Sequence, residues 1–454
     1  MNKLRAVALT VVMITSFTMS MTGSAMNLSV PGISAEFNAQ AETVGWMITG
    51  YMLTVAALSV PFGRWADITC RKTVLVTGIV IFVFGCFGAV MASSMPMLLV
   101  MRIIQGIGGA MVLSTNTPIL LSAYPPNMKG KALGLSIGSV YVGLSLGPVI
   151  GGILTHNIGW RSIFIFAGGI SIIALVTAVF GLPKVDSEGK GRKMDYAGSC
   201  LFAIFIVMFM LGLSKIEGGL VPIIIAVIGF AIGVTFVLFE TKQKDPVLNV
   251  SLFRSNIGYT LSNVAALMNY AATFAISYLT SIYLQVVLGY SSQSAGFILI
   301  CQPLIMALLT PKMGKLSDKY SPFKMSSIGM GLCAIGAAFY IFMGEETSVA
   351  YIAFALAITG LGFAFFSSPN TNAVMSCVEK KDYGVATSVL NTMRTVGQTS
   401  SMVIVTIIVT FLMPGAVLTD VQPETLVKVI NISFTIFTLM CFSGVFISLK
   451  RKRE

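Results

Sequence analysis

Fourteen apolar segments run through this 454-residue sequence. Each is close to the roughly 20 residues that a helix needs to cross the ~30 Å hydrocarbon core of a bilayer. Lipid cannot hydrogen-bond to an exposed backbone, so such segments fold as helices. Only 10% of the residues are charged, against about 25% in soluble domains. We predict an all-α polytopic membrane protein with fourteen spans, at residues 6–31, 43–62, 74–93, 97–121, 132–154, 162–182, 196–214, 220–239, 257–285, 293–311, 324–343, 348–369, 386–412 and 427–448.

Positive charge fixes the orientation of these spans, because basic residues in short loops mark the cytoplasmic face. A cytoplasmic N-terminus places nearly all of the 29 basic residues inside. The exceptions are Arg161, Lys215 and Lys428 in outer loops, with Arg102 and Arg394 inside spans. We predict that both termini are cytoplasmic. The net charge of +12 then reflects membrane topology, and we expect no nucleic-acid partner.

Two charged connections, 183–195 and 240–255, separate the sixth span from the seventh and the eighth from the ninth. The predicted domains are an N-terminal six-helix bundle (1–183), linkers with two extra transmembrane helices (184–255) and a C-terminal six-helix bundle (256–454). GRWADITCRK (63–72) and GKLSDKYSPFK (314–324) share a glycine followed four residues later by Asp67 or Asp318. This repeat favours a parallel duplication of six helices. Coincidence between two basic loops remains the alternative.

The sequence carries no pattern typical of an enzyme or of a metal site. Its seven cysteines are scattered without a C-x-x-C pair, and its single histidine, His156, excludes an H-E-x-x-H zinc site. No phosphate-binding G-x-x-x-x-G-K-[ST] loop is present, and the loops are too short for a catalytic domain. We expect no catalytic residue, no metal and no cofactor.

The segment 63–72 matches the pattern G-x-L-a-D-r-x-G-r-K at Gly63, Ala66, Asp67, Arg71 and Lys72. We interpret it as a cytoplasmic loop in which Gly63 permits a tight turn. Asp67 would cap a helix or pair with a basic neighbour, and the cluster would latch the cytoplasmic gate. The alternative is a solvated loop that only fixes topology.

Arg102 lies several residues inside the fourth span, in LVMRIIQGIGGA (99–110). An arginine at such a depth costs about 2.5 to 3.5 kcal/mol, so it normally faces the bundle interior or a wet cavity. We therefore treat Arg102 as a functional candidate. The alternative is that it extends to the lipid headgroups.

The fifth span contains GLSLGPVIGGIL (143–154), in which Gly143, Gly147, Pro148, Gly151 and Gly152 form a spaced run. Helices in lipid gain little hydrophobic energy by meeting, so small residues at every fourth position allow close backbone approach. Proline bends the helix. We predict a packing hinge at this segment.

Together with Asn391, Arg394 and Gly397 in 388–400, these motifs resemble the major facilitator superfamily, specifically its 14-helix drug:proton antiporters (QacA/EmrB-like). The resemblance covers essentially the whole chain. It implies a major facilitator fold in the bacterial cytoplasmic membrane and a secondary active multidrug exporter. Such a protein exchanges amphipathic small molecules for protons by alternating access, within membrane lipid. The alternative is the same fold exporting a physiological solute or lipid, with or without proton coupling.

The first span departs from the family pattern, because Thr22 stands where the antiporters have a membrane-embedded aspartate. No acid lies near the middle of any predicted span. We assign proton coupling to Glu42, Asp67 and Arg102, the last by resemblance. For Glu42 the simpler interpretation is an acid that favours a helix N-terminus.

With Arg102 and Arg394 as the only charges inside spans, we expect the cavity to favour neutral, zwitterionic or anionic amphiphiles. The residues that we predict to bind substrate are polar, aromatic or methionine side chains within spans: Thr22, Met26, Asn27, Tyr51, Asn116, Tyr141, Asn269, Tyr270, Phe274, Tyr278, Gln302, Phe366, Asn370, Asn391 and Arg394.

Overall fold

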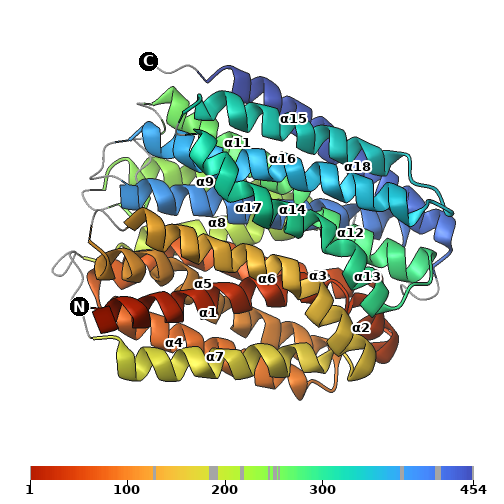
Figure 1. The fold of residues 1–454 in the computed structure, drawn as a ribbon, viewed down its shortest axis with the longest axis horizontal. Helices are drawn as coiled ribbons and strands as arrows, with labels where there is room; N and C mark the ends of the chain where they lie inside the picture. Colours follow the sequence, from red (N-terminus) through yellow and green to blue (C-terminus); the bar gives the residue numbers. More distant parts are fainter. Residues whose placement is uncertain are drawn as a thin grey trace. The chain divides into compact units, whose positions relative to one another are not determined.

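The structure is a computed structural model, and its described part is built from helices, without a strand (Figure 1). The described residues are 2–125, 129–183, 193–214, 219–243, 246–248, 253, 256–317, 319–378, 383–414 and 421–451. Fourteen helices in these ranges are long and apolar enough to cross a membrane, by length and composition. The prediction of an all-α protein with fourteen spans is confirmed.

The first nine helices are α1 (Asn2–Met26), α2 (Val30–Phe37), α3 (Ala41–Ile68), α4 (Arg71–Val90), α5 (Met95–Ala123), α6 (Lys129–Asn157), α7 (Arg161–Gly181), α8 (Tyr196–Ser214) and α9 (Leu220–Glu240). Those that follow are α11 (Ile257–Thr273), α12 (Ala275–Ile282), the π-helical turn η3 (Tyr283–Val287), α13 (Ser292–Leu299), α14 (Cys301–Ser317), α15 (Pro322–Ile341), α16 (Val349–Ser376), α17 (Tyr383–Leu412) and α18 (Pro423–Leu449). Below, inner ends are those predicted to face the cytoplasm, and outer ends are the opposite ones.

Three of the predicted spans are broken rather than continuous, and one of them, 293–311, is divided at Ile300 between α13 and α14. The predicted helix 6–31 ends at Met26, and α2 begins at Val30 with Pro31 in its first turn. Proline fits this position because it has no N–H to leave unpaired there. The predicted helix 257–285 is divided at Phe274 and ends in the π-helical turn η3.

The prediction of a loop from Gly63 to Lys72 is wrong. Helix α3 continues to Ile68 and α4 starts at Arg71, so only Thr69 and Cys70 connect them. Gly63 therefore lies inside α3 and makes no turn. The helix persists because nothing after Pro61 interrupts its backbone hydrogen bonds, and an Asp67–Arg71 pair four residues apart links its last turn to α4.

The chain divides into two compact units. Unit 1 contains residues 1–26, 46–147 and 158–249, and unit 2 contains 27–45, 148–157 and 250–454. In unit 1, α4 packs against both α5 and α7, and α8 against α9 (Figure 1). In unit 2, α15 packs against α16 and α18, and α11 against α17. The predicted domain limits of 1–183, 184–255 and 256–454 stay a prediction.

Small residues let the paired helices approach closely. A Cβ atom on Gly108 of α5 would lie 2.5 Å from the backbone oxygen of Gly78 in α4. A Cβ atom on Gly229 of α9 would lie 2.5 Å from the backbone nitrogen of Phe209 in α8. Close backbone contact of this kind gives helices in lipid the dispersion energy that replaces hydrophobic association.

Arg451, just after α18, is buried and ties together the inner ends of four helices of unit 2. Its Nη1 donates to Asn370 Oδ1 at 2.8 Å and Ser262 Oγ at 3.2 Å, and its Nη2 donates to Ser326 Oγ at 3.1 Å. Its Nε donates to the carbonyl oxygen of Ser448 at 3.0 Å. Burial lowers the pKa of Arg451 to about 10, so the guanidinium stays charged at neutral pH.

We expect Arg451→Ala to lower the free energy of unfolding by about 2 kcal/mol, because it leaves buried oxygens without their donor. The measurement is the midpoint of thermal unfolding of the purified full chain in lipid nanodiscs. Lys450→Ala is the matched control, because the neighbouring Lys450 is exposed. Equal midpoints for the two variants would contradict the role assigned to Arg451.

Candidate functional site

Arg102 of α5 is 2% exposed and is held inside unit 1 by neutral partners. Its Nε donates to the carbonyl oxygen of Met47 at 3.1 Å, and its Nη1 donates to Gln105 Oε1. The guanidinium carbon lies 4.4 Å from the centroid of the Tyr51 ring. Among the described residues, no carboxylate forms an ion pair with Arg102.

This burial excludes the interpretation in which Arg102 extends to the headgroups. A buried charge is tolerated only where hydrogen bonds and ring faces replace water. Gln105 is itself fixed by a hydrogen bond from its Nε2 to Cys86 Sγ at 2.9 Å, which connects the site to α4. The arrangement holds a positive charge at a fixed place in unit 1, with described partners that do not neutralise it.

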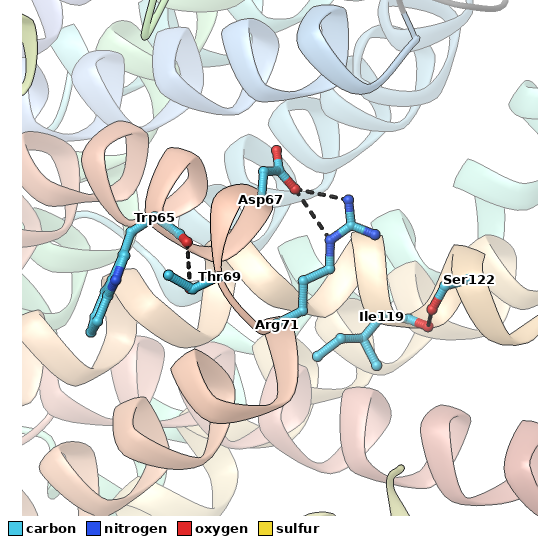
Figure 2. Close-up of polar contacts among 6 residues, drawn as sticks. All are labelled: Trp65, Asp67, Thr69, Arg71, Ile119 and Ser122. Atoms are coloured by element: carbon cyan, nitrogen blue, oxygen red, sulfur yellow. Dashed lines mark hydrogen bonds and ion pairs between the residues drawn. The ribbon is translucent and has the colours of Figure 1, made fainter. Parts of the chain in front are cut away.

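The Asp67 cluster lies where α3 meets α4 (Figure 2). Asp67 Oδ1 accepts hydrogen bonds from Arg71 Nη2 at 2.8 Å and from Arg71 Nε at 3.2 Å. Pairing with Arg71 offsets the unfavourable position of an acid at a helix C-terminus. The side chains of Asp67 and Arg71 are 50% and 23% exposed, so the pair is only partly desolvated.

Lys72 caps the end of another helix of the same unit. Its Nζ donates to the carbonyl oxygens of Val179 and Leu182, at the C-terminus of α7. A cation at a helix C-terminus satisfies carbonyls that have no partner inside the helix. Arg71 and Lys72 also line a pocket together with Ile119 and Ser122 of α5, and Figure 2 shows Ile119 next to Arg71. The predicted gating partner Asp318 lies outside the described residues.

The glycine run of α6 packs tightly in both units. In unit 1, a Cβ atom on Gly143 would lie 2.6 Å from the carbonyl oxygen of Phe17, and one on Gly147 would lie 2.8 Å from that of Met21, both in α1. No side chain fits there without moving α1 from α6. This close packing agrees with the small-residue contact predicted from the spacing.

In unit 2, the segment that follows Gly147 packs against the start of the second six-helix block. A Cβ atom on Gly152 would lie 2.5 Å from the carbonyl oxygen of Ser292, and one on Gly296 would collide with that of Pro148. Gly151 is also buried. We call these residues, with the Asn27 contacts described next, the outer seam.

Asn27 adds hydrogen bonds to the outer seam. Its Nδ2 donates to Ser277 Oγ at 3.1 Å, and its carbonyl oxygen accepts from Ser281 Oγ at 2.9 Å. The Tyr278 hydroxyl lies 3.7 Å from the place of a Cβ atom on Gly45. Short segments of the first six-helix block are thus joined to α12 and α13 within one compact unit.

Arg394 of α17 is the second charge inside a span. Its Nη2 donates to Thr371 Oγ1 at 2.5 Å, and its guanidinium carbon lies 5.6 Å from the centroid of the Tyr270 ring. The Nε atom is buried and has no hydrogen-bond acceptor among the described residues. Tyr270 in turn packs edge-on against Phe363, with ring centroids 5.1 Å apart. Arg394 therefore has an Nε–H without an acceptor in the described part of the chain, and its guanidinium lies beside the Tyr270 ring.

The other residues predicted to bind substrate differ in burial, and their roles stay predictions. Phe274 and Gln302 are half-buried, and Asn391 is exposed. The amide groups of Asn116 and Asn370 are occupied, the first by Thr15 and Ser16 and the second by Arg451 and Ser262. The fully or nearly fully buried ones are Thr22, Met26, Asn27, Tyr51, Asn116, Tyr141, Asn269, Tyr278, Phe366 and Asn370.

Glu42 lies in the first turn of α3, as expected, and is half-buried in unit 2, whereas Asp67 and Arg102 belong to unit 1. Sequence reasoning missed two buried charged groups, Arg451 and Glu240, because both were assigned to cytoplasmic segments. For Glu240 a signal existed, since it directly follows an unbroken apolar run. The partners of Arg451 are spread over four helices, which no local pattern reveals.

Comparison with known proteins agrees with this architecture. The chain is 30% identical over 392 residues to the riboflavin transporter RibZ of Clostridioides difficile, covering 86% of this chain and 85% of RibZ. It is 29% identical over 369 residues to multidrug resistance protein 3 of Bacillus subtilis, covering 79% of this chain and 71% of that protein.

Solved transporters share the fold. A bacterial homologue of the human lysosomal transporter Spinster, in an inward-facing and unoccupied conformation, superposes with a TM-score of 0.70 at 14% identity, covering 99% of both chains. A peptide transporter POT in complex with alafosfalin gives 0.73 at 13% identity, covering 98% of this chain and 94% of that one. The sequence model of the family described as the Major Facilitator Superfamily matches residues 12–402. The chain belongs to the Major Facilitator Superfamily, whose members are membrane transporters.

Proposed function

We propose that the protein is a secondary active exporter of the bacterial cytoplasmic membrane, which moves amphipathic small molecules outward in exchange for protons by alternating access. One observation carries the proposal: the glycine run of α6 is shared between the two compact units, with Gly147 in unit 1 and Pro148 in unit 2. Proline cannot complete the helical hydrogen-bond ladder, so it is a natural place for a helix to bend. Multidrug resistance proteins among the relatives support the same function.

In this proposal the outer seam is a contact that forms and breaks. Gly152, Gly296 and Asn27 join it by backbone contact and by single hydrogen bonds, without an ion pair among the described residues. Such contacts are close in energy to their solvated alternatives, because each hydrogen bond contributes only about 1 kcal/mol net. A transporter needs this near balance, since it alternates between two states.

Few described side chains could carry the proton that is exchanged for substrate. No described span carries an acid near its middle, and Asp67 is already paired with Arg71. We propose Glu42, which is half-buried in the first turn of α3 at its outer end, as the proton carrier. Arg102 would take part in proton coupling as a fixed positive charge inside unit 1.

A second candidate is the same fold moving a physiological solute or lipid, with or without proton coupling. It is favoured by the relative at 30% identity, which is named for riboflavin transport. The charges inside the spans bear on both candidates. Arg102 and Arg394 have neutral described partners, so we propose that the protein prefers neutral, zwitterionic or anionic amphiphiles over dications.

We expect an imposed pH gradient to drive uptake of a suitable dye into proteoliposomes that contain the wild-type chain. We expect Glu42→Gln to lose this proton-driven accumulation while keeping exchange of dye for dye, because the amide cannot carry a proton. Arg102→Ala is expected to lose both the proton-driven accumulation and the exchange of dye for dye. Wild-type transport that ignores the gradient would contradict antiport and favour the second candidate.

Arg394→Gln is expected to weaken transport of anionic substrates about tenfold or more, because a charge-assisted hydrogen bond contributes roughly 1.5 to 3 kcal/mol. Half-maximal concentrations for an anionic and a dicationic dye of similar shape give the measurement. Lys428→Gln is the control, since Lys428 is an exposed cation paired with Glu424. Dicationic dyes as the best wild-type substrates would overturn the charge preference.

Gly152→Ala is expected to open the outer seam, because the added Cβ atom would meet the Ser292 backbone. A disulfide between cysteines placed at positions 27 and 277, in a background without native cysteines, reports closure. We expect this cross-link to form several-fold more slowly with Gly152→Ala. Gly138→Ala in the same helix is the control, because nothing lies within 4 Å of its Cβ position. Equal rates for both variants would argue against a close-packed seam.

A further inference from the structure

The two helices between the six-helix blocks bring two acids together at their inner ends. Asp195 directly precedes α8, and Glu240 is the last residue of α9, which packs along α8 within unit 1. One carboxylate oxygen of each acid accepts a hydrogen bond from a backbone N–H. Asp195 Oδ1 accepts from the backbone N–H of Gly198 at 2.8 Å and caps α8, and Glu240 Oε2 accepts from that of Leu248 at 3.1 Å.

The second oxygen of each acid is buried without a donor. Asp195 Oδ2 and Glu240 Oε1 have no hydrogen-bond partner in the described part of the chain, and Glu240 as a whole is only 2% exposed. Both atoms face the same glycine. A Cβ atom on Gly198 would lie 2.6 Å from Asp195 Oδ2 and would also collide with Glu240 Oε1. Two acceptor oxygens thus converge on one spot that only a residue without a side chain leaves open.

Two ionised carboxylates cannot stay in this position without a cost. Like charges a few ångströms apart repel each other more strongly where water is excluded, and each of the two oxygens also lacks a donor. No basic side chain neutralises them among the described residues. Of the residues that the structure describes, the titratable groups nearest to them along the chain are all exposed: Lys193, Tyr196, Cys200 and Lys242.

A single proton removes both penalties. When one carboxyl group carries it, the O–H donates to the oxygen of the other, and the pair keeps one negative charge instead of two. We propose that Asp195 and Glu240 bind one proton between them at the inner ends of α8 and α9, and that its loss drives these ends apart. This site belongs to the extra helix pair and does not depend on whether transport is coupled to protons.

Infrared difference spectroscopy on the full chain in nanodiscs tests the proposal. We expect a carbonyl band of a protonated carboxyl group at neutral pH that disappears on alkalinisation and shifts in D₂O. Asp195→Asn and Glu240→Gln should each remove this band while helix content is retained. Gly198→Ala should also remove it, because it displaces both oxygens. Glu424→Gln, at an exposed acid paired with Lys428, should leave it unchanged.

Thermal unfolding provides an independent measurement. A proton bound only by the folded protein stabilises it at low pH, and this stability is lost as the pH rises. The wild-type midpoint should therefore fall on alkalinisation. Glu240→Gln places an amide N–H where the proton would lie, so its midpoint should lose this dependence and exceed that of the wild type at high pH.

Three outcomes would overturn the proposal. One is a wild-type spectrum without the band, and another is a band that survives both amide substitutions. The third is a cation site, in which sodium or calcium ions raise the unfolding midpoint of the wild type but not of Glu240→Gln, with no protonated carboxyl present. Because no arm of the test measures transport, its result does not depend on the proposed function.

Discussion

Lipid offers a polypeptide no hydrogen bonds, and the architecture of this protein follows from that fact. Each span must make its backbone hydrogen bonds within itself, so every described span is helical. Hydrophobic burial does not drive helices together in lipid, so another interaction must hold them in contact. Glycines provide it by letting backbones touch, as Gly108 does against α4 and Gly229 against α8. The same rule explains why the break in the first span, at Asn27–Ser29, is buried, and why buried residues, Thr273 and Ala275, flank the break at Phe274 in the ninth.

Two buried arginines and one half-buried arginine show how the described part of the chain holds positive charge without pairing it to an acid. Arg102, Arg394 and Arg451 are all held by carbonyl, amide and hydroxyl oxygens, by aromatic ring faces, or by both. Neutral partners fix a guanidinium in space and leave its charge in place. In Arg451 the outcome is structural, since all three of its guanidinium nitrogens donate hydrogen bonds. The Arg394 Nε–H has no acceptor among the described residues, which makes this arginine the better candidate to meet a solute.

The outer seam combines close backbone contacts with weak polar contacts. Gly152 and Gly296 require a tight fit, whereas Asn27 contributes single hydrogen bonds to serines. In the proposed transport cycle, these tight but uncharged contacts would define a closed arrangement that can still separate. The inner end of the extra helix pair, α8 and α9, differs from this seam, because two acids, Asp195 and Glu240, lie there around Gly198.

The sequence by itself determined the class of the protein, its fourteen spans and the family, because apolar length and motif spacing are local properties that lipid turns directly into structure. It also predicted the close packing of Gly143 and Gly147. Only the tertiary structure decided that Gly63 lies within a helix and that Arg102 is buried rather than extended to the headgroups. It alone revealed Arg451 and the pair of Asp195 with Glu240. Their partners are far apart in the chain, and burial depends on what packs against a residue, which no local pattern contains.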